Sequence, residues 1–208
     1  MLNSGKVMNE MYLKGTQETN ELLYRHFAPK MYGICLRFAG NPMDADDILQ
    51  DGFLKIFTKI KDFRNEGSLE GWIRRTFVNT AINYYRKNSR NQRNGDLDGI
   101  DISDDNNEII YDKLSREELL NLLQELPIGY RTVFNLNVLE GYTHKEIGQM
   151  LGISDNTSKS QLTRARAILQ KRVRNMVREK IKIPFEDFKI LRSRNPKIDA
   201  DFEYSEAV

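Results

Sequence analysis

The sequence predicts an all-α protein with two small helical domains, the second containing a helix-turn-helix, joined by a flexible acidic linker. Apolar residues recur at helical spacing over most of the 208 residues. No segment alternates apolar and polar residues in the manner of a half-buried strand. Between residues 88 and 112 the helical period stops, in a stretch rich in Asn, Asp, Ser and Gly.

The composition argues against membrane, secreted and metal-bound classes of protein. Hydrophobic residues make up 39% and charged residues 30% of the chain, and no apolar run approaches the roughly 20 residues of a membrane-spanning helix. Residues 1–15 lack the hydrophobic core of a secretory signal. The single Cys35 cannot form an internal disulfide, and with His26 and His144 it falls short of four zinc ligands. We therefore expect a cytoplasmic protein that needs no cofactor.

The layout of charge predicts a polyanionic partner, although the net charge is only +2. Residues 73–93 hold six Arg or Lys and no acid, and residues 156–178 hold seven and no acid. Residues 96–118, between them, hold nine Asp or Glu against two basic residues. A single charged stretch is often only a solvated face, but two acid-free basic stretches in separate domains favour nucleic-acid binding.

Three helices are expected in the first domain, over residues 18–39, 44–60 and 69–88, with Ser68 as N-cap of the third. Cys35 lies in the apolar stripe of the first helix and is expected to be a core residue.

Acidic residues crowd the start of the second helix, at Asp44, Asp46, Asp47 and Asp51. The macrodipole favours acids there, so Asp44 and Asp46 are explained by helix capping alone. Asp47 and Asp51 stand four residues apart on one outward face and could dock a basic partner.

The third helix carries a polar face formed by Arg75, Asn79, Asn83 and Arg86. Such a face is unsuited to a core but suits a nucleic-acid backbone with exposed bases. The aromatic candidates for stacking on unpaired bases are Phe63, Trp72 and Tyr84.

The second domain begins with a Leu-rich helix over residues 117–126, followed by a second helix that runs up to Gly141, and then a helix-turn-helix signature. The landmarks of this signature are the Thr143 and Glu146 capping box, the turn residue Gly152, an N-cap at Ser154 or Asp155, and a basic helix through Arg174. In such a motif the second helix enters the major groove of DNA. His144, next to the cap, is expected to be an exposed residue of the first turn.

These ordered motifs resemble the bacterial RNA polymerase sigma factors of the sigma-70 family, extracytoplasmic-function (ECF) subfamily. The resemblance covers roughly residues 16–178 and rests on segments 44–57, 63–87, 126–154 and 157–169. It implies five parts, namely an N-terminal extension (1–15), sigma region 2 (16–90), the acidic linker (91–112), sigma region 4 (113–178) and a C-terminal extension (179–208). Apolar residues between 181 and 191 could form a small amphipathic patch, although disorder or weak packing is the simpler interpretation of this extension.

The resemblance also implies roles for particular residues. Contacts to core polymerase are predicted for Asp47, Gln50, Asp51 and Lys55. Contacts to the opened minus-ten element are predicted for Arg64, Trp72, Arg75, Asn79, Asn83 and Arg86, with the loop 64–71 capturing a flipped non-template base. Contacts to the minus-thirty-five duplex are predicted for Thr157, Lys159, Ser160, Thr163, Arg164 and Arg166. Ser158 and Gln161 depart from the apolar and basic residues that the family often has at these positions.

The function implied is that of a dissociable initiation subunit, which gives polymerase its promoter specificity and helps to melt DNA without catalysis. Its implied partners are core RNA polymerase, through the β′ clamp helices and the β flap, promoter DNA and an anti-sigma factor. Membrane insertion and a small-molecule substrate are not expected. The acidic linker could occupy a positively charged RNA channel of the polymerase.

Two other interpretations remain open at the level of sequence. A stand-alone helix-turn-helix regulator would explain residues 143–174 but would leave the faces of Asp47 and Asn79 without a role. A metal-dependent nucleic-acid enzyme would use the four clustered Asp residues to hold Mg²⁺, although helical geometry points Asp44 and Asp46 in different directions.

Overall fold

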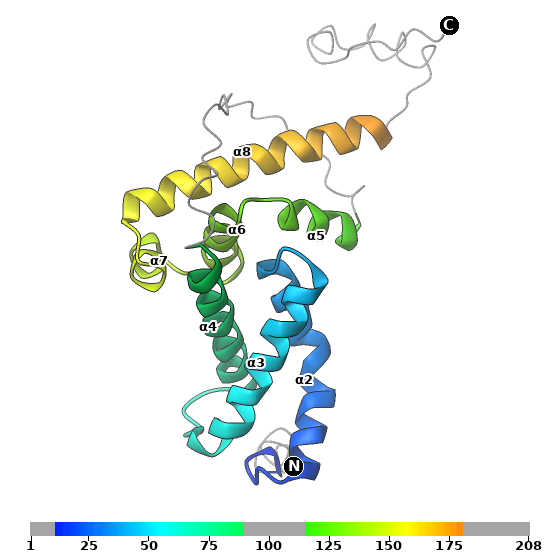
Figure 1. The fold of residues 1–208 in the computed structure, drawn as a ribbon, viewed down its shortest axis with the longest axis vertical. Coiled ribbons are helices and arrows are strands. Elements are labelled where there is room, and N and C mark those ends of the chain that lie inside the picture. Colours follow the sequence, from blue (N-terminus) through cyan, green and yellow to red (C-terminus); the bar gives the residue numbers. More distant parts are fainter. Residues whose placement is uncertain (1–10, 90–114, 181–208) are drawn as a thin grey trace, which may run out of the picture.

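The computed structural model describes residues 11–89 and 115–180, and these form two helical modules (Figure 1). The described residues contain helices and no strand, which confirms the expected all-α class. The expectations for residues 1–10, for the acidic linker and for residues 181–208 lie outside the described residues. None of the helices within the described ranges is long and apolar enough to cross a membrane.

The first module consists of α2 (Gln17–Phe38), α3 (Pro42–Lys59), the 3₁₀ turn η1 (Ile60–Asp62) and α4 (Leu69–Ser89). Local capping sets where these helices begin. The Ser68 hydroxyl accepts a hydrogen bond from the Gly71 amide (2.9 Å), as expected for an N-cap. Helix α3 begins two residues earlier than expected, because the Asn41 side chain caps it and Pro42 fits the first helical position.

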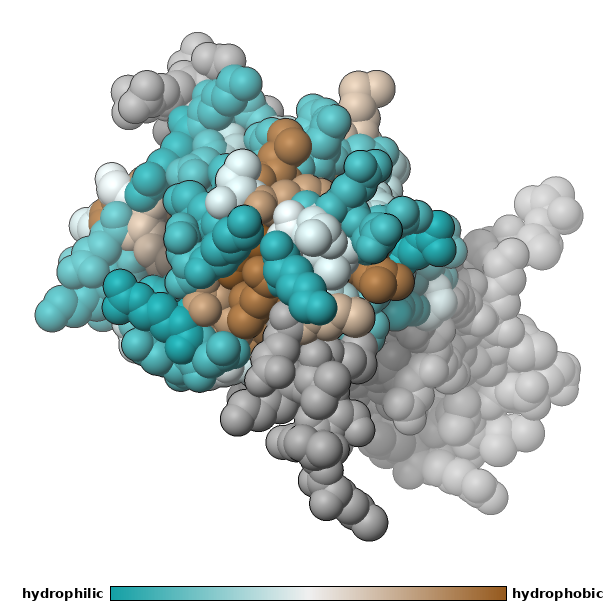
Figure 2. Space-filling model, turned by 90° about the horizontal axis from the view of Figure 1, so that it is seen from below, coloured by the Kyte–Doolittle hydropathy of each residue, from teal (hydrophilic) through white to brown (hydrophobic). Residues whose placement is uncertain are grey.

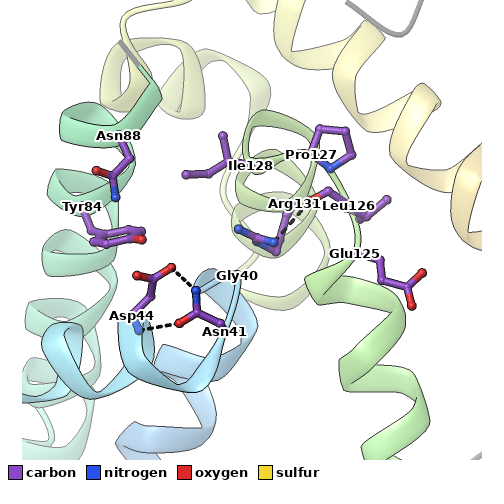
Figure 3. A pocket seen from close by; sticks show the side chains of 10 residues that line it. All are labelled: Gly40, Asn41, Asp44, Tyr84, Asn88, Glu125, Leu126, Pro127, Ile128 and Arg131. Atoms are coloured by element: carbon purple, nitrogen blue, oxygen red, sulfur yellow. Dashed lines mark hydrogen bonds between the residues drawn. The ribbon is translucent and has the colours of Figure 1, made fainter. Parts of the chain in front are cut away.

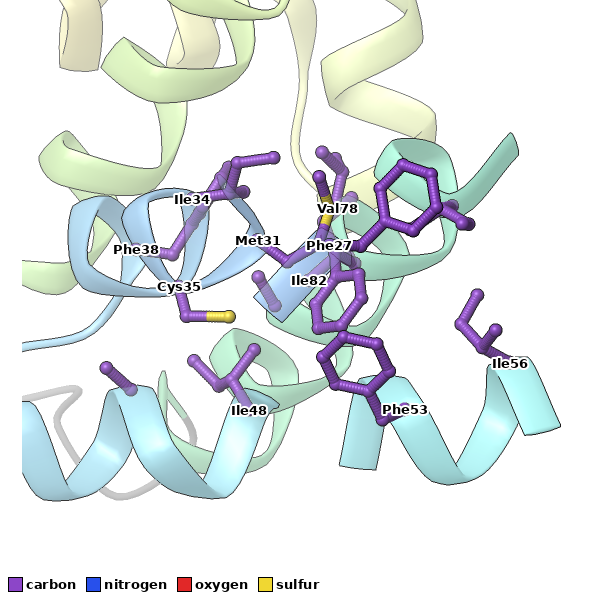
Figure 4. Packing of buried hydrophobic residues seen from close by; sticks show 14 of the residues in the cluster. Phe27, Met31, Ile34, Cys35, Phe38, Ile48, Phe53, Ile56, Val78 and Ile82 are labelled. Atoms are coloured by element: carbon purple, nitrogen blue, oxygen red, sulfur yellow. The ribbon is translucent and has the colours of Figure 1, made fainter. Parts of the chain in front are cut away.

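The core of the first module lies where α2, α3 and α4 meet (Figure 4). The apolar stripe that helical spacing predicts for α2 is buried throughout, and it consists of Leu23, Phe27, Met31, Ile34, Cys35 and Phe38. The Phe53 and Phe77 rings meet edge to face, with centroids 5.1 Å apart. Cys35 is fully buried, and its burial raises the pKa of the thiol to about 12, so this thiol stays protonated and packs as a small apolar group.

The second module consists of α5 (Arg116–Gln124), α6 (Ile128–Phe134), the π-helical turn η3 (Asn135–Leu139), α7 (His144–Leu151) and α8 (Asp155–Lys180). The Thr143 and Glu146 side chains form the predicted capping box. Gly152 has φ +70°, the left-handed conformation that ends α7. The Ser154 hydroxyl accepts from the Thr157 amide (3.0 Å), so Ser154 is the cap of α8.

One expectation for the second module was wrong in detail. The helix expected to run regularly up to Gly141 is α6 followed by the π-helical turn η3. Such a turn depends on how the surrounding helices pack, so the spacing of apolar residues in the sequence does not predict it.

The two modules pack directly against each other, which the sequence did not predict. Helix α2 contacts α5 and α6, and α4 contacts α6 and α7 (Figure 1). The buried apolar cluster of the first module continues into the second through Val133, Leu136 and Ile147.

We expect Gly52→Ala to destabilise the first module by about 2 kcal/mol. A Cβ at Gly52 would overlap the buried ring of Phe77. Overpacking costs up to about 3 kcal/mol, while the helix propensity of Ala returns up to about 1 kcal/mol. The matched control is Gly33→Ala in α2, where an added Cβ meets nothing within 4 Å. This variant should gain about 0.5–1 kcal/mol in a thermal or urea melt, and equal effects of the two changes would contradict the packing described.

Candidate nucleic-acid interface

Helix α4 separates a buried side from an exposed polar side. Its core side includes Ile73 and Phe77, both fully buried. The four predicted minus-ten residues of its polar face, Arg75, Asn79, Asn83 and Arg86, are all exposed. Arg75, Asn79 and Asn83 are therefore available for contacts that the fold itself does not need, whereas the Arg86 guanidinium also donates to the Met150 carbonyl of α7 (3.0 Å).

A cavity of about 540 Å³ lies at the start of α4, against the loop that precedes it. It brings together three predicted minus-ten residues, Arg64, Trp72 and Arg75. The rings of Phe63 and Trp72 lie in the wall with centroids 5.8 Å apart. Seen from below, the molecule presents hydrophobic surface enclosed by hydrophilic side chains (Figure 2). The aromatic wall and the two guanidinium groups suit a planar base and its phosphate, and the carboxylates of Asp62 and Glu66, which also line the cavity, offset part of the positive charge.

Tyr84, the third aromatic candidate, lies away from this cavity. It lines a cavity of about 610 Å³ between the modules, together with Asp44, Asn88 and Arg131 (Figure 3). Burial, followed by its hydrogen bond to Asp44, raises the pKa of Tyr84 to about 12. Tyr84 therefore lies at the contact between the two modules and not beside the loop 64–71.

The outward side of α3 exposes Asp47, Gln50 and Asp51, as predicted for a docking surface. Lys55 is half-buried instead, and its Nζ donates to Thr80 Oγ1 (3.1 Å), so it faces α4. Met43 is 76% exposed at the N-terminal end of α3. Leu54, 57% exposed, lies on the same stripe as Asp47 and Asp51. These exposed apolar residues were not predicted, although they stand four and seven residues from Asp47, on the same helical face.

The four Asp residues at the start of α3 do not form a metal site. Asp44 lines the inter-module cavity, and Asp46 lies beside Tyr32, while Asp47 and Asp51 are exposed on the other side of the helix. Among the residues described, no group of three or more His, Cys, Asp or Glu could hold a metal ion.

The recognition helix α8 exposes four predicted minus-thirty-five residues, Lys159, Ser160, Thr163 and Arg166. The other two are half-buried. The Thr157 hydroxyl bonds to Ser154 Oγ (2.8 Å), and the Arg164 guanidinium donates to Tyr130 Oη (3.3 Å). Gln161, also half-buried, lies against Gly129.

The expectation for His144 was wrong, because this residue is half-buried and contacts the recognition helix. His144 Nδ1 lies 2.9 Å from the hydroxyl of Ser158, which is fully buried. Ser158, one of the two departures from the family pattern, therefore has a polar partner in His144. The bond links α7 to α8 beside the exposed Lys159.

Comparison with known proteins agrees with this geometry. The model of sigma-70 region 2 matches residues 23–91, and that of sigma-70 region 4 matches residues 116–169. The ECF RNA polymerase sigma factor SigE of Mycolicibacterium smegmatis is 31% identical over 152 residues, which cover 71% of this chain and 59% of that protein. The ECF RNA polymerase sigma-E factor of Escherichia coli K12 is 26% identical over 185 residues, covering 83% and 96%.

Two solved structures also align with the chain. One is CnrH in complex with the cytosolic domain of CnrY (TM-score 0.44, 19% identity, covering 83% of this chain and 99% of that one). The other is the sigma factor RpoE with the anti-sigma factor NepR from Bartonella quintana (TM-score 0.45, 23% identity, covering 73% and 94%).

Two helical modules, of which the second carries a helix-turn-helix, have the arrangement of a sigma-type DNA-binding protein. The two region models together match more than half of the chain, and the chain belongs to the sigma-70 family, among the ECF sigma factors. The family membership confirms the resemblance that the sequence motifs carry.

We expect His144→Ala and Ser158→Ala to show a coupling energy of about 1 kcal/mol in a double-mutant cycle of unfolding free energies. Each single change leaves a polar atom of the other residue without its partner, whereas the double change removes both. The control is Ser160→Ala, because the Ser160 hydroxyl bonds only to the Thr157 carbonyl of its own helix. Additive effects of the two Ala changes would show that the hydrogen bond is not formed in solution.

Proposed function

We propose that the chain is an ECF sigma factor that binds core RNA polymerase, directs it to promoters and helps to open the DNA. It acts in the cytoplasm with the polymerase and contributes binding rather than catalytic chemistry. The observation that carries this proposal is the convergence of Arg64, Trp72 and Arg75 on one cavity, next to the exposed Asn79 and Asn83. A regulator that binds only duplex DNA has no need of such a site.

The first module opens the minus-ten element by capturing an unpaired base. Extruding a base costs a few kcal/mol in lost stacking and pairing. Trp72, which packs against the buried ring of Phe63, returns about 1–3 kcal/mol by stacking on that base. Arg75 holds the backbone at the cavity, and Asn79 and Asn83 meet the bases that follow.

The second module reads the minus-thirty-five duplex through the N-terminal turns of α8. Lys159 and Arg166 contact the phosphates and base edges, while Ser160 and Thr163 lie between them on the exposed side. The hydrogen bond between His144 and Ser158 keeps α7 and α8 in a fixed relation, so that α8 enters the groove at one angle.

Helix α3 docks on the β′ clamp helices, and the second module docks on the β flap. Asp47 and Asp51 supply carboxylates for basic residues, and Leu54 supplies an apolar contact on the same stripe. An anti-sigma factor would regulate the chain by binding one or both modules. The two aligned solved structures hold CnrY and the anti-sigma factor NepR, respectively.

The direct test mixes the purified chain with core RNA polymerase on a promoter template. Co-elution of the two on size exclusion and a promoter-dependent transcript are expected. A chain that binds duplex DNA but neither co-elutes nor supports transcription would be a stand-alone regulator, and the proposal would be rejected.

We expect Lys159→Ala to weaken binding to a minus-thirty-five duplex about tenfold, because it removes an exposed cation from the recognition helix. Binding is measured by fluorescence anisotropy at one fixed salt concentration. Co-elution with core polymerase should be unchanged. The control is Lys59→Ala, an exposed lysine of the first module. If both lysine variants lost the same affinity, the loss would reflect overall charge rather than the recognition helix.

We expect the double change Asp47→Arg and Asp51→Arg to weaken association with core polymerase by roughly tenfold or more, because it reverses the charge of the docking face. Association is measured by surface plasmon resonance on immobilised core. A matched double reversal on α2, Glu18→Arg with Glu21→Arg, changes the same number of exposed charges elsewhere. Unchanged association of the α3 variant would remove this face from the proposal.

A further inference from the structure

The recognition helix α8 is longer than its predicted DNA contacts require. Those contacts end at Arg166, whereas α8 continues to Lys180. At 1.5 Å per residue, residues 167–180 add about 21 Å of helix. In a helix-turn-helix the N-terminal residues of the recognition helix meet the base edges. Because a straight helix leaves the curved groove after a few turns, the second half of α8 lies beside the groove and not in it.

The inward side of this second half is packed against the rest of the module. Ile168 lies in one buried cluster with Tyr130 of α6, and Val173 is also buried. Arg172 forms an ion pair with Glu125 at the end of α5. Helix α8 lies across α6 and α5 (Figure 1), so its inward side is fully used by the fold. This packing fixes the direction in which the opposite side of α8 points.

The outward side of α8 forms one continuous stripe that contains no acidic residue. Helical residues three or four positions apart share a face. Lys171 and Arg174 stand on this stripe, Lys171 exposed and Arg174 half-buried. Within the described residues, neither side chain forms a hydrogen bond or an ion pair. The stripe, at steps of three or four, consists of Asn156, Ser160, Thr163, Ala167, Lys171 and Arg174.

The stripe places these two cations on the side of α8 that carries the predicted base contacts. Arg174 stands about 22 Å along the helix from Lys159, at 1.5 Å per residue. This length corresponds to about six base pairs of duplex, at 3.4 Å per base pair. The polyanion closest to Lys171 and Arg174 is therefore the backbone of the same duplex, several base pairs from the bases that α8 reads.

We propose that Lys171 and Arg174 bind phosphates of the duplex that flanks the minus-thirty-five element, on the side toward which α8 runs. We call this the flank contact. It rests on the proposed function, from which it takes the entry of α8 into the minus-thirty-five duplex. Phosphate contacts carry no sequence information, but they fix the orientation of a protein on DNA. The flank contact therefore adds affinity and direction to a recognition helix without adding base preference.

The first test measures how salt affects duplex binding by the full chain. Each neutralised phosphate contributes about 0.9 to the slope of log K against log salt concentration. We expect Lys171→Gln with Arg174→Gln to make the slope less steep by about two and to weaken binding about tenfold. The loss should be equal for a minus-thirty-five duplex and for a duplex of unrelated sequence, because the contact does not read bases.

The matched control uses the residue that lies between the two cations in the sequence. Arg172→Gln also removes one positive charge, but from the inward side, where Arg172 pairs with Glu125. This variant should keep the slope of the parent chain, whereas Lys171→Gln alone should make it less steep by about one. Thermal melts of each variant verify that the second module stays folded.

The second test locates the contact on the DNA. Two shortened duplexes each lose the flank on one side of the minus-thirty-five element. The parent chain should lose affinity about tenfold on one of them and keep it on the other. The double variant of Lys171 and Arg174 should bind both shortened duplexes equally, because the contact to the missing flank is already absent.

The proposal is overturned if the double variant keeps the parent slope, if Arg172→Gln changes the slope as much as Lys171→Gln, or if neither flank matters. A double variant that binds duplex normally but loses core polymerase also overturns it, because the cations then meet an acidic protein surface. Failure of the proposed function is read separately. A chain with the expected slopes and flank effect but no promoter-dependent transcript keeps the flank contact and loses the sigma-factor assignment.

Discussion

The carbonyls at the end of α2 are the constraint around which the two modules are arranged. Leu36, Arg37 and Phe38 end the central helix of the first module, and each presents a carbonyl that its own helix leaves unpaired. Because three side chains of the second module donate to them, the position of that module follows from the geometry of a helix terminus. Buried backbone groups without partners are costly, so this contact is specific in a way that apolar packing alone is not.

The same interface explains how the functional surfaces are distributed. The outward side of α3 and the cavity of Arg64, Trp72 and Arg75 lie away from the inter-module contact and stay accessible. Arg86 is different, because it belongs to the predicted minus-ten face and also bonds to the backbone of α7. The predicted polymerase face is therefore accessible in the packed arrangement, whereas one residue of the predicted minus-ten face is held by the inter-module contact.

Residues of the candidate site could be predicted wherever helical spacing alone decides which side chains face outward. Asp47, Asn79, Asn83 and Lys159 lie on the outward sides that their spacing predicts. Lys55 and Arg164 lie near such faces, but their long side chains turn inward to Thr80 and Tyr130. Helical spacing gives the direction of the Cα–Cβ bond. The rest of a long, flexible side chain can then turn toward a nearby hydrogen-bond partner.

The sequence by itself determined the helices, their caps and the helix-turn-helix, because a capping box such as Thr143 with Glu146 and a turn residue such as Gly152 act within a few neighbouring positions. Only the tertiary structure decided the packing of the modules, the π-helical turn and the pairing of His144 with Ser158. Those features join groups far apart in the chain, as Gln124 joins Leu36 across 88 positions. A polar side chain in the sequence does not show which distant backbone group it will satisfy.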